Sequence, residues 1–143
     1  MTPQHADVMP RAEQLDTVNK ARLPVLRHFL NAFLAPETLG WRVGLATATG
    51  TWGEARGLAI ANAIQAFVAA VLKCRPVPVC YQDPLDLHAR KLLSADEIDL
   101  LALISAMRRD RTDQARTLVE RLTGGQVRAA VVRFGRASCR ERV

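Results

Sequence analysis

A stretch of fifteen residues, Leu58 to Leu72, contains only two polar side chains, Asn62 and Gln65. A helix that is apolar on almost every side must be buried on almost every side, because water solvates it poorly. The stretch is also too short to cross a bilayer, since fifteen helical residues span about 22 Å and the hydrocarbon core is about 30 Å thick. It therefore predicts the central helix of a globular helical bundle, and no membrane span.

Two rows of side chains run along this predicted helix, one small and one bulky. The small-residue row consists of Ala59, Ala63, Ala66 and Ala70. The bulky row consists of Ile60, Ile64, Phe67 and Val71. Rows of this kind let one neighbouring helix approach closely and another interdigitate. The small-residue row indicates a close contact within the fold, with a homodimer contact as the alternative.

The start of the central helix is predicted from a capping box. Thr51 and Glu54 are three residues apart, so their side chains could satisfy free backbone N–H groups at a helix start. We expect the helix to begin at Thr51 and to run to about Lys73. The glycine-rich stretch before it, from Pro36 to Gly53, predicts a packed loop, with Trp41 and Trp52 against the core.

A second capping box stands later in the chain. Ser94 and Glu97 have the same spacing, and Leu93 and Ile98 occupy the positions of a hydrophobic staple. This combination predicts a helix that begins at Ser94 and ends near Asp110.

Two more helices are expected after it. Thr112 can cap the first, which should end at Gly124 and Gly125. The second is expected to place Val127, Ala130, Val131 and Phe134 on one side and the candidate residues Arg133 and Arg136 on the other.

Prolines divide the remaining segments. A helical period begins at Arg11, and Pro24 predicts a kink or break within it, with His28 at its polar edge. Residues 74–83 predict an extended connector. Asp83 and Pro84 predict the start of a short helix that places Leu85, Ala89 and Leu92 on one side.

These signals together define the expected fold. It is an all-α, single-domain helical bundle of five to seven helices around a central apolar helix. The helical domain is expected over residues 11–137, after a flexible N-terminal arm at 1–10 and before a frayed tail at 138–143.

The reactive residues argue against catalysis. Three cysteines without a paired framework predict a protein of the reducing cytoplasm, and Cys74, Cys80 and His88 lack the spacing of a zinc site. The segment from Gly40 to Gly53 precedes a helix but lacks the lysine of a nucleotide-binding loop. We therefore expect no metal, no cofactor and no catalytic residue. Small-ligand binding or an enzyme function at this glycine-rich segment stays as a second alternative.

Charge gives the one functional indication. The net charge of the chain is +6, and all of it lies in residues 108–143, which hold ten arginines and four acidic residues. Such asymmetry predicts a negatively charged partner. We expect a small interaction or regulatory module that docks an acidic protein, with nucleic-acid binding as the alternative because a tight connection at Asp110 would suit a helix-turn-helix. The candidate partner-binding residues are Arg108, Arg109, Gln114, Arg116, Thr117, Arg121, Arg133 and Arg136.

Overall fold

The fold is known from a computed structural model, which describes residues 9–125. Over this range the α-helices are α1 (Thr17–Leu34), α2 (Gly40–Trp52), α3 (Glu54–Cys74), α4 (Ala95–Arg108) and α5 (Thr112–Thr123). Short 3-10 helices are η1 (Ala12–Gln14), η2 (Pro36–Thr38) and η3 (Ala89–Lys91). The described range contains no β-strand. The prediction of an all-α, single-domain bundle is confirmed.

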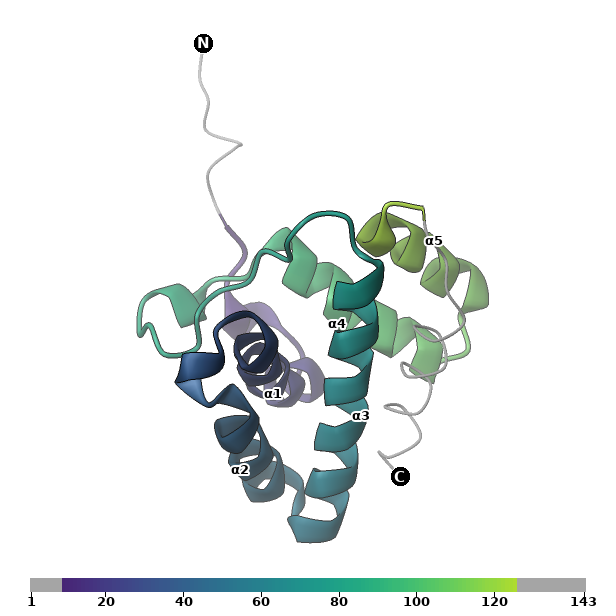
Figure 1. The fold of residues 1–143 in the computed structure, drawn as a ribbon. Coiled ribbons are helices and arrows are strands. Elements are labelled where there is room, and N and C mark those ends of the chain that lie inside the picture. Colours follow the sequence, from purple (N-terminus) through teal and green to yellow (C-terminus); the bar gives the residue numbers. More distant parts are fainter. Residues whose placement is uncertain (1–8, 126–143) are drawn as a thin grey trace.

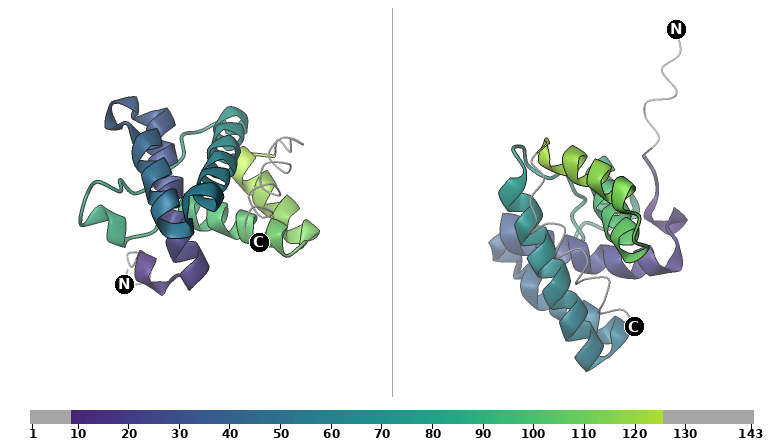
Figure 2. Two further views of the ribbon diagram at one scale, coloured as in Figure 1. Left: turned by 90° about the horizontal axis from the view of Figure 1, so that it is seen from below. Right: turned by 90° about the vertical axis from the view of Figure 1, so that its right-hand side faces the viewer.

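The long apolar helix α3 occupies the middle of the bundle. It lies between α2 on one side and the α4 and α5 pair on the other (Figures 1 and 2). The bulky row is buried as predicted, since none of its four residues is more than 3% exposed. Among the described helices, α3 is long and apolar enough to cross a membrane, and 56% of its most apolar window is buried within the fold. The other helices of the bundle thus bury much of the apolar surface of α3.

The small-residue row is covered only in part. Ala63 and Ala70 are buried, whereas Ala59 and Ala66 are partly exposed. The outer side of α3 also carries Leu58, which is 44% exposed. Packing within the fold therefore accounts for half of the row, and the homodimer remains a prediction.

The predicted loop before the central helix is wrong, because most of it forms α2. Two of its glycines, Gly40 and Gly44, lie where α2 packs on α1. A Cβ atom at Gly40 would collide with the carbonyl oxygen of His28 and lie 2.8 Å from the backbone nitrogen of Ala32. A Cβ at Gly44 would lie 3.0 Å from the ring of Phe29. These glycines mark close helix contacts and not a flexible loop.

The two tryptophans of this segment have different environments. Trp52 is partly buried and packs against the core, as expected. Trp41 is 48% exposed, so its predicted burial is wrong. It lies in the first turn of α2, on a side that α1 does not cover.

The capping box at Thr51 is also wrong. Thr51 belongs to α2, and its hydroxyl donates to the carbonyl oxygen of Thr47 at 2.8 Å. The chain turns instead at Gly53, whose φ of +86° is readily adopted only by glycine. The central helix therefore begins at Glu54, and it ends at Cys74, close to the expected Lys73.

Helix α1 starts later than predicted and is continuous through Pro24. Residues after Arg11 form only η1, and Asp16 caps α1 by accepting the Asn19 N–H at 2.7 Å. His28 does not lie at a polar edge. It is 8% exposed, because α2 and the later connector cover this side of α1, and burial lowers its pKa.

The connector after α3 is extended as predicted, but no helix begins at Pro84. The carboxylates of Asp83 and Asp86 accept N–H groups two or three residues ahead, and this stabilises turns in place of a helix. Of the expected apolar side, Leu85 is 57% exposed, whereas Ala89 and Leu92 are partly buried, so this side packs only in part.

The second capping box is confirmed. The Ser94 hydroxyl oxygen accepts the Glu97 N–H at 3.1 Å, and the Glu97 carboxylate accepts the Ser94 N–H at 2.9 Å. Leu93 is buried, while its staple partner Ile98 is 37% exposed. The helix that follows, α4, ends at Arg108, slightly earlier than expected.

Helix α5 agrees with the sequence at its end more than at its start. Thr112 is its first residue and not a cap, since Arg111 precedes it without a side-chain cap. The expected end is confirmed, with Gly124 and Gly125 at positive φ. The expected apolar stripe is buried and consists of Ala115, Leu118, Val119 and Leu122. The last predicted helix, with its apolar stripe of Val127, Ala130, Val131 and Phe134, lies outside the described residues, as does the tail at 138–143.

A buried ion pair holds the connector against α1 and α4. Arg27 and Glu97 are 3% and 0% exposed, and their side chains form two hydrogen bonds, of 2.5 Å and 3.0 Å. The guanidinium also donates to the carbonyl oxygens of Arg90 and Leu92, and the carboxylate accepts the Gln82 N–H. Both charges are therefore well supplied with hydrogen bonds, as burial requires.

Replacing Ser94 with alanine should lower the free energy of unfolding by about 1 kcal/mol, because α4 loses its N-cap acceptor. The Ser94 hydroxyl also donates to the Cys80 carbonyl oxygen at 2.6 Å, which adds to the loss. Urea denaturation followed by circular dichroism measures the change. Thr51→Ala is the matched control and should cause no such loss, since Thr51 caps no helix. Equal midpoints for the two variants would contradict the assignment.

Candidate functional site

The predicted partner-binding residues gather around the hairpin formed by α4 and α5. Arg108 is the last residue of α4, Arg109 follows it, and Gln114 stands in the first turn of α5. Arg116 and Thr117 lie on the exposed side of α5. Arg121 stands near the end of the same helix. The two other candidates, Arg133 and Arg136, lie outside the described residues.

Two of these candidates are already engaged within the fold. Arg121 forms an ion pair with Asp99 at 3.0 Å. The Thr117 hydroxyl donates to the Asp113 carbonyl oxygen at 3.1 Å, one turn back in α5. Neither side chain is therefore a strong candidate for binding a partner.

Four exposed arginines at the hairpin form no ion pair with any described residue: Arg108, Arg109, Arg111 and Arg116. We call them the arginine surface. Other arginines of the fold are bonded, including Arg11, Arg27, Arg75 and Arg121. Within the described range, the arginine surface is thus a place where several guanidinium groups close together in the sequence are available to an external anion.

The charge of the described hairpin is smaller than the sequence total suggests. Residues 108–125 hold five arginines and three acidic residues, a net of +2. The remaining +4 belongs to residues 126–143, outside the described range. The positions of the hairpin charges, and not their sum, therefore distinguish this surface.

A pocket of about 210 Å³ lies where the start of α1 meets the end of α4 and the start of α5. It is lined by Asp16, Asn19, Ala102, Ser105, Ala106, Arg109, Arg111 and Gln114. Sequence reasoning identified two of these residues, Arg109 and Gln114. It missed Arg111, Ser105 and Asn19, although Arg111 belongs to the same arginine-rich segment.

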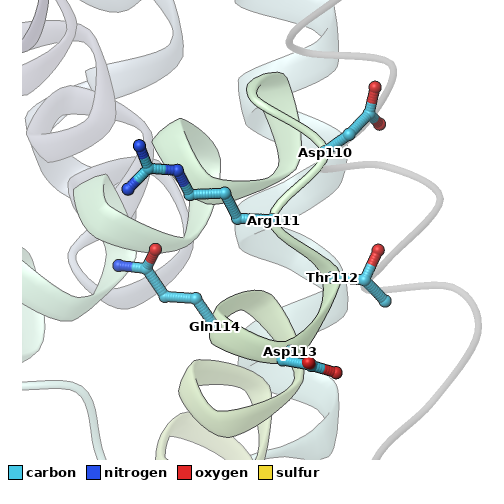
Figure 3. Close-up of a pocket in the computed structure, with 5 residues that line it drawn as sticks. All are labelled: Asp110, Arg111, Thr112, Asp113 and Gln114. Atoms are coloured by element: carbon cyan, nitrogen blue, oxygen red, sulfur yellow. The ribbon is translucent and has the colours of Figure 1, made fainter.

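The turn between α4 and α5 separates acidic from basic side chains. Figure 3 shows Arg111 and Gln114 pointing to one side of the turn, whereas Asp110, Thr112 and Asp113 point to the other. Asp110 adopts a φ of +54°, which accompanies the sharp change of direction. The nearby carboxylates are therefore turned away from the side on which Arg111 and Gln114 lie.

A buried arginine stands behind the pocket. Arg22 is 3% exposed, and its guanidinium donates to the Asn19 side-chain oxygen at 3.2 Å and to the Ser105 hydroxyl oxygen at 3.4 Å. Asp16 is engaged as well, since its carboxylate caps α1. Polar side chains of α1 and α4 that line the pocket are thus held in place by hydrogen bonds.

A second polar cluster lies between α1 and the connector. The Tyr81 hydroxyl donates to the side-chain oxygen of Asn31 at 2.6 Å, and Asn31 is 3% exposed. Burial raises the pKa of Tyr81, and the charges of Asp83 and Glu37 raise it further. Burial lowers the pKa of His28, against the opposing effect of Asp83. No described serine or cysteine is hydrogen-bonded to this cluster, so it offers no arrangement for nucleophilic chemistry.

The described residues contain no group of three or more histidine, cysteine or acidic side chains that could hold a metal ion. The glycine-rich segment considered for ligand binding is helical, and two of its glycines are covered by α1. A phosphate-binding loop at that position therefore has no structural basis. No protein family, curated protein or solved structure matches the chain. The described chain is thus a small all-α bundle with an arginine surface beside a polar pocket.

Proposed function

We propose that this protein is a non-enzymatic interaction module that binds an acidic protein partner through the arginine surface. The supporting observation is that Arg108, Arg109, Arg111 and Arg116 are exposed and form no ion pair within the described part of the chain. Exposed charges of this kind contribute little to folding stability. Their concentration at one hairpin is better explained by an external anion.

The chemistry of arginine suits a carboxylate-bearing partner. A guanidinium group presents a planar fork of donors that can bind a carboxylate through two hydrogen bonds. Asp110 and Asp113 interrupt the arginine series, so the hairpin does not present a uniform positive charge. A mixed pattern favours a partner of matching pattern over a uniformly charged polymer.

Nucleic-acid binding is the competing proposal, and the turn argues against it. In a helix-turn-helix the first residues of the second helix approach the bases of DNA. Here Asp110 and Asp113 point to the same side of that turn as Thr112, the first residue of α5, so DNA phosphates that approached this side would face two carboxylates. An acidic protein that docks on the opposite side, where Arg111 and Gln114 lie, avoids this repulsion.

Removing two guanidinium groups that lie outside the pocket lining tests the proposal. We expect Arg108→Gln/Arg116→Gln to weaken binding to a fluorescein-labelled acidic peptide of several glutamates and one lysine about tenfold, since each exposed charge contact contributes up to about 1 kcal/mol. Fluorescence anisotropy over about 50 to 200 mM salt measures it, with duplex DNA as a second probe.

Arg42→Gln/Arg90→Gln is the matched control, because it removes the same charge from exposed side chains on other elements. It should bind the peptide nearly as well as the wild type. Equal weakening in both double variants would mean that net charge, and not the arginine surface, governs binding. Tighter binding of duplex DNA than of the peptide, with a steep salt dependence, would favour the nucleic-acid alternative.

A further inference from the structure

We propose that the pocket between α1, α4 and α5 binds a phosphate monoester group carried by the acidic partner. The inference rests on the proposed function and gives that function a specificity element. Its basis is the set of hydrogen-bonding groups around the pocket, which offers many donors and few free acceptors.

The buried Arg22 determines what two pocket residues can offer a ligand. Its guanidinium occupies the side-chain oxygen of Asn19 and the hydroxyl oxygen of Ser105. A carboxamide whose oxygen is occupied still has its N–H₂ donors, and a hydroxyl that accepts still has its own O–H donor. No described residue accepts from either donor group. Asn19 and Ser105 are therefore left as donors at the pocket.

The remaining polar residues add to this excess of donors. Arg109 and Arg111 carry guanidinium groups, which can only donate, and neither is paired within the described range. Gln114 supplies a carboxamide that points to the same side as Arg111 (Figure 3). The acidic residue of the lining, Asp16, already accepts the Asn19 N–H at the start of α1. The pocket thus suits a ligand made of acceptor oxygens.

The number of donors distinguishes a phosphate monoester from a carboxylate. Five lining residues carry N–H or O–H donors, namely Asn19, Ser105, Arg109, Arg111 and Gln114, and the one acidic residue among the lining is Asp16. A phosphate monoester carries about −1.5 to −2 at neutral pH and has three strong acceptor oxygens. A carboxylate has two acceptor oxygens, so it would leave more of these donors unmatched.

The size of the pocket is consistent with a single charged group. Its volume of about 210 Å³ is below the range of about 300 to 1,000 Å³ that is typical of sites for whole small molecules. A phosphorylated side chain could enter it while the rest of the partner stays on the adjoining arginine surface, since Arg109 and Arg111 belong to both. One polypeptide could therefore use both features together.

Three fluorescein-labelled acidic peptides, identical except for a central phosphoserine, serine or glutamate, test the inference by anisotropy. Wild-type protein at about pH 7.5 should bind the phosphoserine peptide about tenfold more tightly than the serine peptide, with the glutamate peptide close to serine. Added inorganic phosphate should lower the apparent affinity of the phosphoserine peptide towards that of the serine peptide. It should leave the binding of the serine peptide unchanged. Lowering the pH to about 5.5 should reduce this preference, because the second phosphate pKa is near 6.

Substitutions in the pocket then test whether its residues cause the stronger binding of the phosphoserine peptide. Arg111→Gln and Ser105→Ala should each bring the ratio between phosphoserine and serine peptides close to one, and denaturation curves verify folding. Since Arg111 is exposed, its variant keeps the test valid if Ser105→Ala unfolds. Arg108→Gln/Arg116→Gln is the control and should weaken all three peptides alike while the ratio persists.

The outcomes separate the inference from the proposed function. Equal binding of all three peptides by the wild type would overturn the phosphate site and leave the acidic-partner function standing. No binding of any peptide would overturn both. A ratio that Arg111→Gln and Ser105→Ala leave unchanged would place the phosphate elsewhere and refute this pocket.

Discussion

Replacing Arg27 with methionine is expected to lower the free energy of unfolding by about 3 to 5 kcal/mol. The substitution leaves the carboxylate of Glu97 buried at 0% exposure without its counter-charge. It also removes the donor for the carbonyl oxygens of Arg90 and Leu92. Because a domain of this size is stable by only about 5 to 15 kcal/mol, the loss should be plain in urea denaturation monitored by circular dichroism.

An exposed ion pair provides the control for this experiment. Arg121→Met breaks the pair with Asp99, but the Arg121 side chain is 60% exposed, so the loss should stay below about 1 kcal/mol. The double variant Arg27→Met/Glu97→Met should recover part of the loss, since it leaves no unpaired buried charge. If Arg27→Met and Arg121→Met were equally stable, the buried pair would not hold the connector.

Replacing Gly40 with alanine should cost about 1 to 3 kcal/mol or more, because the added methyl group has no space. It would collide with the backbone of α1 at His28 and Ala32, and would lie 3.0 Å from the Cβ of Asn31. Backbone atoms cannot rotate away as a side chain can, so α1 and α2 would have to separate. Thermal and urea denaturation both measure the loss.

Gly50→Ala is a control within the same helix and should have the opposite sign. No atom lies within 4 Å of the position where its Cβ would stand, and Gly50 is helical. Alanine is favoured over glycine in a helix by up to about 1 kcal/mol, so this variant should be slightly more stable than the wild type. Destabilisation by both substitutions would show that α2 tolerates no side chain at either glycine, and would refute the contact argument for Gly40.

Local signals predicted those parts of the fold that depend on local interactions. The capping box of Ser94 and Glu97 was found because its two hydrogen bonds join residues three positions apart. The end of α5 was found because Gly124 and Gly125 adopt backbone conformations that other residues avoid. Burial of the central helix followed from its composition alone.

Helix α2 could not be predicted in this way. Glycine disfavours a helix in isolation. Gly40 and Gly44 are needed here because α1 lies so close that a larger side chain at either position would collide with it. That reason exists only after the two helices have packed. The same limit explains the error at Thr51, where the spacing to Glu54 is suitable but the turn occurs at Gly53.

The sequence predicted only those residues of the candidate site that lie in the segment between α4 and α5. Charge identified Arg109, and the expected recognition helix identified Gln114. Asn19 and Ser105 reach the same pocket from α1 and α4, and the buried Arg22 bonds to both of them. Nothing in the local sequence joins residues this far apart, so tertiary packing was needed to complete the site.

The ion pair between Arg27 and Glu97 also bears on the order in which the chain folds. The most extensive helix contacts join neighbours in sequence, namely α1 with α2, α2 with α3, and α4 with α5. The ion pair joins residues 70 positions apart, so it closes a much longer loop. We therefore expect contacts between sequence neighbours to form first, and residues 17–74 and 95–123 to dock late. An interaction made after the folding barrier controls how slowly the native protein opens and has little effect on how fast it forms.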